Sequence, residues 1–284
     1  MTNTKQDMRT GTIAFQGEPG ANSDTACRNV YPNMTPMPCA TFDDAFDVLK
    51  QGDADLAMIP IENTLAGRVA DIHQLLPNSG LHIIREYFLP IHFHLMAKRG
   101  TSLQEIDTVY SHIHGLPQCR DIIRKNGWTG IVAADTAGAA RMVGDMSERN
   151  VAALAPRLAA LLYDLDILVE HAEDAEHNTT RFIVLSREPE IPDVEDGPAV
   201  TTFVFRVRNV PAALYKVMGG FATNGVNMTK LESYQLGTFT ATLFYADIEG
   251  HPEQQNVKFA LEEMEFFSAE KRILGVYPAE GERG

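Results

Sequence analysis

The feature of this sequence that most constrains its fold is an arginine at the entrance to an apolar run. Thr180 and Arg181 stand directly before Phe182-Ile183-Val184-Leu185, a segment with the composition of a buried strand. A strand cannot bury a guanidinium group unless an anionic group pairs with it. Arg181 therefore either extends to solvent or meets an acidic ligand, and polar residues far upstream favour the second interpretation.

A second polar cluster follows another apolar run. Ile59-Pro60-Ile61 ends in Glu62, Asn63 and Thr64, which offer a carboxylate, an amide and a hydroxyl in succession. In an α/β sheet, polar residues at the C-terminal ends of strands lie at the edge where ligands usually bind. The alternative is that Asn63 or Thr64 caps the next segment, and the cluster alone does not separate the two interpretations.

Two further junctions join an apolar run to a polar loop. Ser111 follows a strand-like segment and Gln118 lies near the start of the next predicted helix, so both can face a cleft. His112 and His114 lack a third ligand at the spacing of a metal site, which disfavours metal binding there. The turn at 17–23 has neither GxGxxG nor GxxxxGK, but backbone N–H groups at a helix start can hold an anion.

The first part of the chain alternates strand-like and helix-like segments, which predicts βαβ units and a largely parallel sheet. Ser23 is a plausible cap for the first helix. Two such halves, with Thr180–Leu185 crossing back to the first, predict a bilobal α/β domain with its ligand site between the lobes. The predicted strands are 12–15, 54–61, 108–110, 130–133, 151–154 and 167–169, the predicted helices are 42–49, 117–124 and 136–143, and 81–97 is strand-rich.

An acidic segment rich in proline and glycine, 188–199, predicts a linker. Beyond it, predicted elements follow in the order strand, helix, strand, strand, helix, strand, which is the ferredoxin-like pattern. Pro211 is well placed in the first turn of the first of these helices. The predicted strands are 202–207, 227–234, 238–245 and 272–276, and the predicted helices are 211–222 and 253–267.

Charge and composition exclude several classes of partner. Lys plus Arg number 24 and Asp plus Glu number 38, so the formal net charge is −14. This argues against nucleic acid and anionic membrane surfaces, and an anionic ligand requires a locally positive site. Sparse cysteines, a polar start and the lack of any apolar stretch of transmembrane length predict a cytoplasmic protein. Cys119 has no clear base partner for nucleophilic catalysis.

Taken together, these junctions resemble prephenate dehydratase followed by an ACT regulatory domain, from about Thr12 to Val276. Pro60-Ile61-Glu62-Asn63 and Thr180-Arg181-Phe182 match the catalytic signatures of that family. Ser111-His112, Gln118-Cys119 and the turn at 17–23 match in their expected order. The resemblance implies a catalytic domain over 8–187, with lobes of about 8–85 plus 175–187 and 86–174, a linker over 188–199, and an ACT domain over 200–280.

The resemblance implies conversion of prephenate to phenylpyruvate with loss of carbon dioxide and water. No cofactor or metal is required, because aromatisation drives the reaction. The family assigns the acid role to Thr180, which as a very weak acid acts as a hydrogen-bond donor or proton relay. Glu62, buried near the substrate anions, would have a raised pKa and donate or relay a proton. Asn63 completes the catalytic set, and the implied substrate-binding residues are Arg181, Thr64, Ser111, Gln118, Ala21, Ser23 and Phe182.

In that family, phenylalanine binds where two ACT domains pair, which implies a homodimer or a homotetramer. Two segments depart from the family pattern: Pro211-Ala212-Ala213-Leu214 replaces Pro-Gly-Ala-Leu, and Tyr234-Gln235 stands where the motif Glu-Ser-Arg-Pro has Arg-Pro. These departures predict weaker or altered control by phenylalanine. The implied effector residues are Ala213, Leu214, Asn227, Leu231, Glu232 and Ser233.

Two other functions stay open. Arogenate carries an amine and a carboxylate where prephenate has a keto acid, and one pocket contact can decide between them. The turn at 17–23 and the segment Asp135–Ala140 are similar to plant arogenate dehydratases. A non-enzymatic amino-acid sensor is also compatible with a bilobal fold, although the Glu62 and Thr180-Arg181 clusters favour catalysis.

Overall fold

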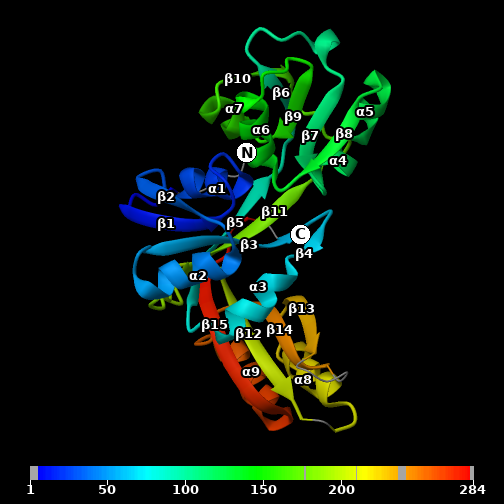
Figure 1. Ribbon diagram of the computed structural model, residues 1–284. Coiled ribbons are helices and arrows are strands. Elements are labelled where there is room, and N and C mark those ends of the chain that lie inside the picture. The colour runs from blue at the N-terminus through cyan, green and yellow to red at the C-terminus, as the bar shows by residue number, and fades with distance from the viewer. Residues whose placement is uncertain (1–5, 176, 209, 236–240, 282–284) are drawn as a thin grey trace. The chain divides into compact units, whose positions relative to one another are not determined.

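The computed structural model describes residues 6–175, 177–208, 210–235 and 241–281. The chain divides into two compact units: an N-terminal unit of residues 4–72 and 87–182, and a C-terminal unit of residues 73–86 and 183–284. The helices and strands of both are labelled in Figure 1. None of the helices within the described ranges is long and apolar enough to cross a bilayer.

The first sheet of the N-terminal unit has the strand order β11-β3-β1-β2. Its strands are β1 (Gly11–Gln16), β2 (Met34–Cys39), β3 (Leu56–Asn63) and β11 (Thr179–Ser186), and the short β4 (Gly67–Arg68) pairs with β3. Strand β1 runs parallel to β2 and to β3, with α1 (Asn22–Val30) and α2 (Phe42–Gln51) as the crossovers. The predicted βαβ units are therefore confirmed, since parallel neighbours need such connections.

The second sheet of this unit is mixed. Its order is β10 (Leu165–Val169), β6 (His94–Lys98), β9 (Val151–Ala155), β7 (Thr108–His112) and β8 (Thr129–Ala133). Strand β7 is parallel to β8 and β9, whereas β6 is antiparallel to β9 and β10. Helices α6 (Thr136–Asp145) and α7 (Arg157–Leu162) pack an apolar face against β9, while η2 (Leu103–Glu105), α4 (Gly115–Gln118) and α5 (Arg120–Asn126) complete the unit.

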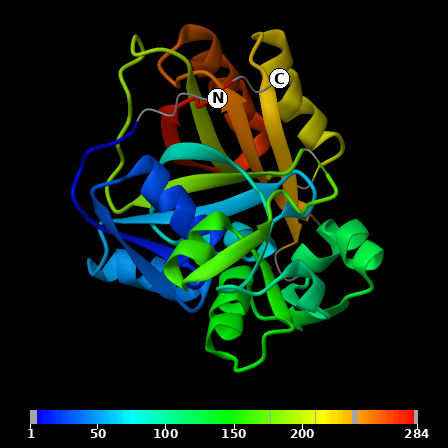
Figure 2. The same cartoon turned by 90° about the horizontal axis from the view of Figure 1, so that it is seen from above.

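The C-terminal unit has the ferredoxin-like order predicted from the sequence. Its sheet runs β13-β14-β12-β15-β5, and β12 is antiparallel to both β14 and β15. Figure 2 shows helices α8 and α9, whose apolar residues pack with those of β12 and β14 in one core. The elements are α3 (Ala70–Leu75), η1 (Leu76–Asn78), β5 (His82–Pro90), β12 (Ala199–Val207), α8 (Ala213–Thr223), β13 (Met228–Gln235), β14 (Ala241–Glu249), α9 (Gln255–Phe267) and β15 (Ser268–Pro278).

Several element boundaries differ from the prediction for local reasons. Ser23 is not the cap of α1: the cap position is Ala21, and Ser23 lies buried inside the first turn. Helix α8 begins at Ala213 instead of Pro211, because Ala212 adopts a left-handed backbone with φ +61°. The helix predicted over 117–124 is broken at Cys119 into α4 and α5. The predicted strand 238–245 starts outside the described residues, and β14 is described from Ala241.

Two glycines in the C-terminal unit give opposite predictions for substitution by alanine. A Cβ atom at Gly275, which pairs β15 with Ile83 of β5, would lie 2.2 Å from the Ile83 carbonyl oxygen. A Cβ atom at Gly219 in α8 would meet no described atom within 4 Å. We expect Gly275→Ala to lower the free energy of unfolding by about 1–3 kcal/mol through overpacking. The matched control Gly219→Ala should raise it by about 0.5–1 kcal/mol, because glycine is a poor helix former.

Urea unfolding followed by circular dichroism measures both changes. A neutral or stabilising Gly275→Ala would contradict the close approach of β15 to β5.

Candidate active site

The two polar clusters of the sequence meet because β3 and β11 are neighbours in the sheet. The Thr64 N–H donates to the Thr179 carbonyl at 3.0 Å. The Thr179 N–H donates in return to the Thr64 hydroxyl oxygen, also at 3.0 Å. This reciprocal pair fixes the register between two segments that lie 115 residues apart in the sequence.

The side-chain amide of Asn63 is the centre of a polar network. Its nitrogen lies 2.7 Å from Asn178 Oδ1 and 2.9 Å from Thr180 Oγ1. Its oxygen accepts hydrogen bonds from the backbone N–H groups of Leu65 and Ala66 at 2.9 and 2.8 Å. Asn63 therefore caps the turn that follows β3 and also holds Thr180, whereas ligand binding at this cluster stays a prediction.

Arg181 is buried, with 4% of its surface exposed. Its Nη1 donates to Glu62 Oε1 at 3.0 Å, and its guanidinium carbon lies 6.0 Å from the centre of the Phe88 ring. Arg181 thus does not extend to solvent, because its guanidinium group is buried against a carboxylate of the same protein. Its role in binding an acidic ligand stays a prediction.

Asn178 extends this network to Gln118. Its Nδ2 donates to Gln118 Oε1 at 2.8 Å, and its backbone carbonyl accepts from the Ile91 N–H at 2.8 Å. Asn178 is 5% exposed. No role for Asn178 was predicted, although it precedes Thr180 by two residues; an amide directly before a polar strand end is the sequence signal that could identify it.

The other predicted substrate-binding residues have different partners. Ser111 is fully buried and its hydroxyl donates to the Leu154 carbonyl at 2.8 Å, whereas Phe182 belongs to the apolar core. Ala21 and Ser23 lie at the start of α1. There the Ala21 N–H donates to a backbone carbonyl at 3.1 Å, so it is already engaged within the turn at 17–23.

His112 and Cys119, which the sequence places near this site, are held in unreactive forms. The His112 Nδ1 accepts from the His114 backbone N–H at 3.3 Å. Burial, followed by the charge of His114, lowers the pKa of His112 and favours its neutral ring. Burial, followed by the charges of Asp174 and Glu173, raises the pKa of the Cys119 thiol. A protonated, buried thiol is a poor nucleophile.

The predicted effector residues lie in the C-terminal unit, at the start of α8 and along β13. Asn227 donates to Glu249 Oε2 at 3.0 Å, and Glu232 Oε1 lies 3.6 Å from Lys230 Nζ. The neighbouring Tyr234 hydroxyl forms a hydrogen bond with a ring nitrogen of His73. Of the rest, Ala213 is buried, Leu214 and Leu231 are partly buried against the core, and Ser233 is exposed.

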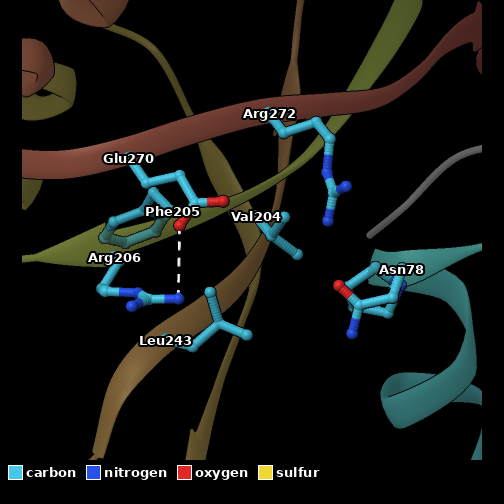
Figure 3. Close-up of a pocket in the computed structure, with 8 residues that line it drawn as sticks. Asn78, Val204, Phe205, Arg206, Leu243, Glu270 and Arg272 are labelled. Carbon is cyan, nitrogen blue, oxygen red and sulfur yellow. Dashed lines mark ion pairs between the residues drawn. The ribbon is translucent and has the colours of Figure 1, made fainter. Parts of the chain in front are cut away.

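Two cavities of the C-terminal unit are lined by other residues. The smaller, about 50 Å³, has the Arg206–Glu270 ion pair (3.2 Å) on one side and Asn78 on the other (Figure 3). The larger, about 330 Å³, is lined by residues of β5, β15 and the segments 189–191 and 251–253. Neither lining includes a predicted catalytic or effector residue.

Comparison with known proteins gives consistent matches. The family model that describes prephenate dehydratases matches residues 13–190. The chain is 48% identical to a Komagataeibacter europaeus protein named bifunctional N-acyl-homoserine lactone acylase/prephenate dehydratase, over 94% of this chain and 95% of that protein. It is 36% identical to arogenate dehydratase/prephenate dehydratase 1 of Arabidopsis thaliana, over 94% of this chain and 71% of that protein. A structure of prephenate dehydratase from Arthrobacter aurescens in complex with L-Phe is similar, with a TM-score of 0.86, 30% identity and coverage of 95% and 90%.

The three cysteines, Cys27, Cys39 and Cys119, are buried and free, and burial raises the pKa of each thiol. Because the thiolate is the reactive form, we expect none of them to react with dithiobis(nitrobenzoate) at neutral pH in the folded protein. All should react after denaturation in guanidinium chloride, which serves as the control. A fast-reacting thiol in the folded protein would contradict this assignment.

Proposed function

The chain belongs to the prephenate dehydratase family, and from this premise we propose that it converts prephenate to phenylpyruvate with loss of carbon dioxide and water. The observation that carries the proposal is the hydrogen bond from the Asn63 amide to Thr180, next to the ion pair between Arg181 and Glu62. These groups can supply what the reaction needs, which is a donor for the departing hydroxyl and a cation for a substrate carboxylate.

Thr180 acts as the donor to the departing hydroxyl group. The Asn63 N–H donates to Thr180 Oγ1 at 2.9 Å, which occupies a lone pair of that oxygen and directs its hydrogen elsewhere. A hydroxyl that accepts one hydrogen bond is also polarised to donate another. Asn63 is thus a positioning residue. Its own side chain is held by a hydrogen bond to Asn178, which in turn donates to Gln118.

Substrate binding changes the state of Glu62. Prephenate carries two carboxylates, and the protein has a formal charge of −14, so its anionic substrate meets a repulsive field. When a substrate carboxylate approaches Arg181, it comes close to the carboxylate of Glu62 as well. Like charges in one site favour uptake of a proton by one of them. Protonated Glu62 then provides the proton for the leaving hydroxyl, either directly or through Thr180 as a relay.

The C-terminal unit supports a regulatory role. We propose a catalytic domain over 8–187, a linker over 188–199 and an ACT domain over 200–280 that binds phenylalanine in a homodimer or homotetramer. The ferredoxin-like order of β12 to β15 and the similarity to a prephenate dehydratase solved with L-Phe support this assignment.

Two other activities are second candidates because of specific relatives. Arogenate dehydration is favoured by the similarity to the plant enzymes. Hydrolysis of an N-acyl-homoserine lactone is favoured by 48% identity to the Komagataeibacter europaeus protein, whose name includes that acylase activity. The buried thiol of Cys119 does not provide a nucleophile for such a hydrolysis.

One experiment tests the proposed reaction against these alternatives. Prephenate, arogenate and an N-acyl-homoserine lactone are supplied separately to the purified protein, and phenylpyruvate, phenylalanine and free fatty acid are measured. We expect the highest kcat/KM for prephenate. Turnover of arogenate alone reassigns the substrate, and tight binding of a small amino acid without turnover of any substrate supports a sensor instead.

Removal of the Thr180 hydroxyl tests its role as donor. We expect Thr180→Ala to lower kcat by roughly 10²–10⁴-fold, the usual contribution of a positioned proton donor, while Thr180→Ser retains most of the activity. Thr35→Ala, at an exposed position of β2, is the matched control and should match the wild type. Equal rates for Thr180→Ala and the control, with unchanged circular dichroism, would refute the assigned role.

Tyr234 tests the effector proposal. It stands where the family motif has arginine, and its hydroxyl is hydrogen-bonded to His73. We expect weak inhibition of the wild type by phenylalanine and tighter inhibition of Tyr234→Arg, measured by titration against rate and by binding heat. Tyr234→Phe, which removes only the hydroxyl, is the control. Strong inhibition of the wild type at micromolar phenylalanine would contradict this prediction, because it would show that the change in the motif does not weaken feedback inhibition.

A further inference from the structure

Three side chains from two separate loops of the N-terminal unit converge on one point. His92 follows β5, whereas His171 and Glu173 follow β10. His92 Nδ1 lies 2.7 Å from Glu173 Oε1. His171 Nδ1 lies 3.1 Å from His92 Nδ1 and 3.3 Å from the same Glu173 oxygen. Each residue therefore directs one atom with a lone pair into a single small triangle.

No arrangement of hydrogens on the two ring nitrogens gives each pair of these three atoms a favourable hydrogen bond. A carboxylate oxygen accepts only, and a ring nitrogen donates only when it carries a hydrogen. If both Nδ1 atoms are protonated, both can donate to Glu173, but the two N–H groups oppose each other across 3.1 Å. If only His92 Nδ1 is protonated, the lone pair of His171 Nδ1 faces that of the Glu173 oxygen at 3.3 Å. If only His171 Nδ1 is protonated, the lone pair of His92 Nδ1 faces that of the Glu173 oxygen at 2.7 Å. A cation at the centre is a partner that suits all three atoms together.

The distances match those of a metal site. Two imidazole nitrogens and a carboxylate oxygen are typical ligands of Zn²⁺, and ligand atoms around a tetrahedral zinc ion lie roughly 3.3 Å apart. The three separations here are 2.7, 3.1 and 3.3 Å. Small adjustments of these side chains would place each atom at bonding distance from one ion. The set suits zinc and related transition metals better than magnesium or calcium, which prefer oxygen ligands.

The surroundings hold the ligands in place. Glu173 Oε2 accepts from the Phe93 N–H at 2.8 Å, which orients the carboxylate toward the histidines. The backbone N–H of His171 donates to His94 Nδ1 at 3.3 Å, and His171 has a left-handed backbone with φ +50°. Such a conformation is unfavourable for a residue with a side chain and is concentrated at functional sites. The side chains of His92 and His171 are 44% and 57% exposed, so an ion can reach them from solvent.

We propose that His92, His171 and Glu173 bind one divalent transition-metal ion of the zinc type, with water completing the coordination. The ion joins the loop after β5 to the loop after β10. None of its ligands belongs to the hydrogen-bonded network of Asn63 and Thr180, so its role is to hold two loops together and not to take part in dehydration. The proposal is independent of which substrate the protein uses.

Metal binding to the full-length protein tests this proposal. The protein is treated with EDTA, exchanged into metal-free buffer and titrated with Zn²⁺ by calorimetry and with Co²⁺ by visible absorption. We expect one equivalent to bind and to raise the melting temperature, with a Co²⁺ spectrum typical of four-coordinate nitrogen and oxygen ligands. His171→Ala and Glu173→Gln should each weaken binding at least about tenfold, because even the loss of an outer-shell partner has that effect.

The control is His114→Ala, which removes an exposed histidine outside the triangle and should bind like the wild type. His92→Ala provides a third test in case one ligand variant does not fold. Failure of the wild type to bind Zn²⁺ or Co²⁺ would overturn the proposal. So would equal affinity in the wild type and in the folded ligand variants, which would place the ion at another site. The opposite pattern, with binding lost only in the three ligand variants, would establish the site.

Discussion

The ion pair between Arg181 and Glu62 is the interaction on which the candidate active site depends. Arg181 is almost completely buried, whereas the side chain of Glu62 is 32% exposed, and removing the partner of a buried charge is destabilising. The pair therefore fixes β11 against β3. Thr180 and Asn63 are the immediate chain neighbours of the two charged residues, so the same constraint sets the short contact between them.

This arrangement also has an electrostatic consequence. Glu62 contacts Arg181, so an anion that reaches Arg181 also comes close to a carboxylate. Under the proposed function, the approach of a dianionic substrate then favours release of Glu62 from the pair or its protonation. Under that function, protonation is useful, because the reaction needs a proton at the moment when the second anion arrives.

Local sequence patterns predicted most of the strands, the ferredoxin-like order and the meeting of the two polar clusters. They did not predict β2, whose sequence contains two prolines, or helix α7. Each of the correct predictions depends on residues close together in the chain or on the rule that strand ends share one edge of a sheet.

The partner of Arg181 was not predicted, because an internal carboxylate and a ligand carboxylate satisfy a buried guanidinium equally well. Asn178 was missed for a related reason: its role depends on Asn63 and Gln118, which only the tertiary fold brings to it. The early break of the helix at Cys119 and the position of Ser23 depend on backbone geometry that composition does not reveal.

The histidines illustrate the same limit. His112 and His114 are two residues apart, a spacing that suggests a metal site in the sequence. In the structure, His112 Nδ1 accepts a hydrogen bond from the backbone N–H of His114. His92 and His171 are 79 residues apart and converge only because β6 pairs with β10. Sequence spacing identifies metal sites built within one loop or helix, and it cannot identify a site whose ligands come from loops beside two neighbouring strands.

The loop that follows β10 connects this cluster to the candidate active site. Glu173 contributes to the histidine cluster, and the next residue, Asp174, accepts from the backbone N–H groups of Arg120 and Asp121 at the start of α5. The Asp174 N–H donates to the Gln118 carbonyl at 2.7 Å, and Asn178 then binds the Gln118 side chain. The N–H of Ile91, the neighbour of His92, donates to the Asn178 carbonyl.

A metal ion at His92, His171 and Glu173 would therefore restrain both segments that hold Asn178. Because Asn178 shares the Asn63 amide with Thr180, its own position limits how far the proposed donor can move.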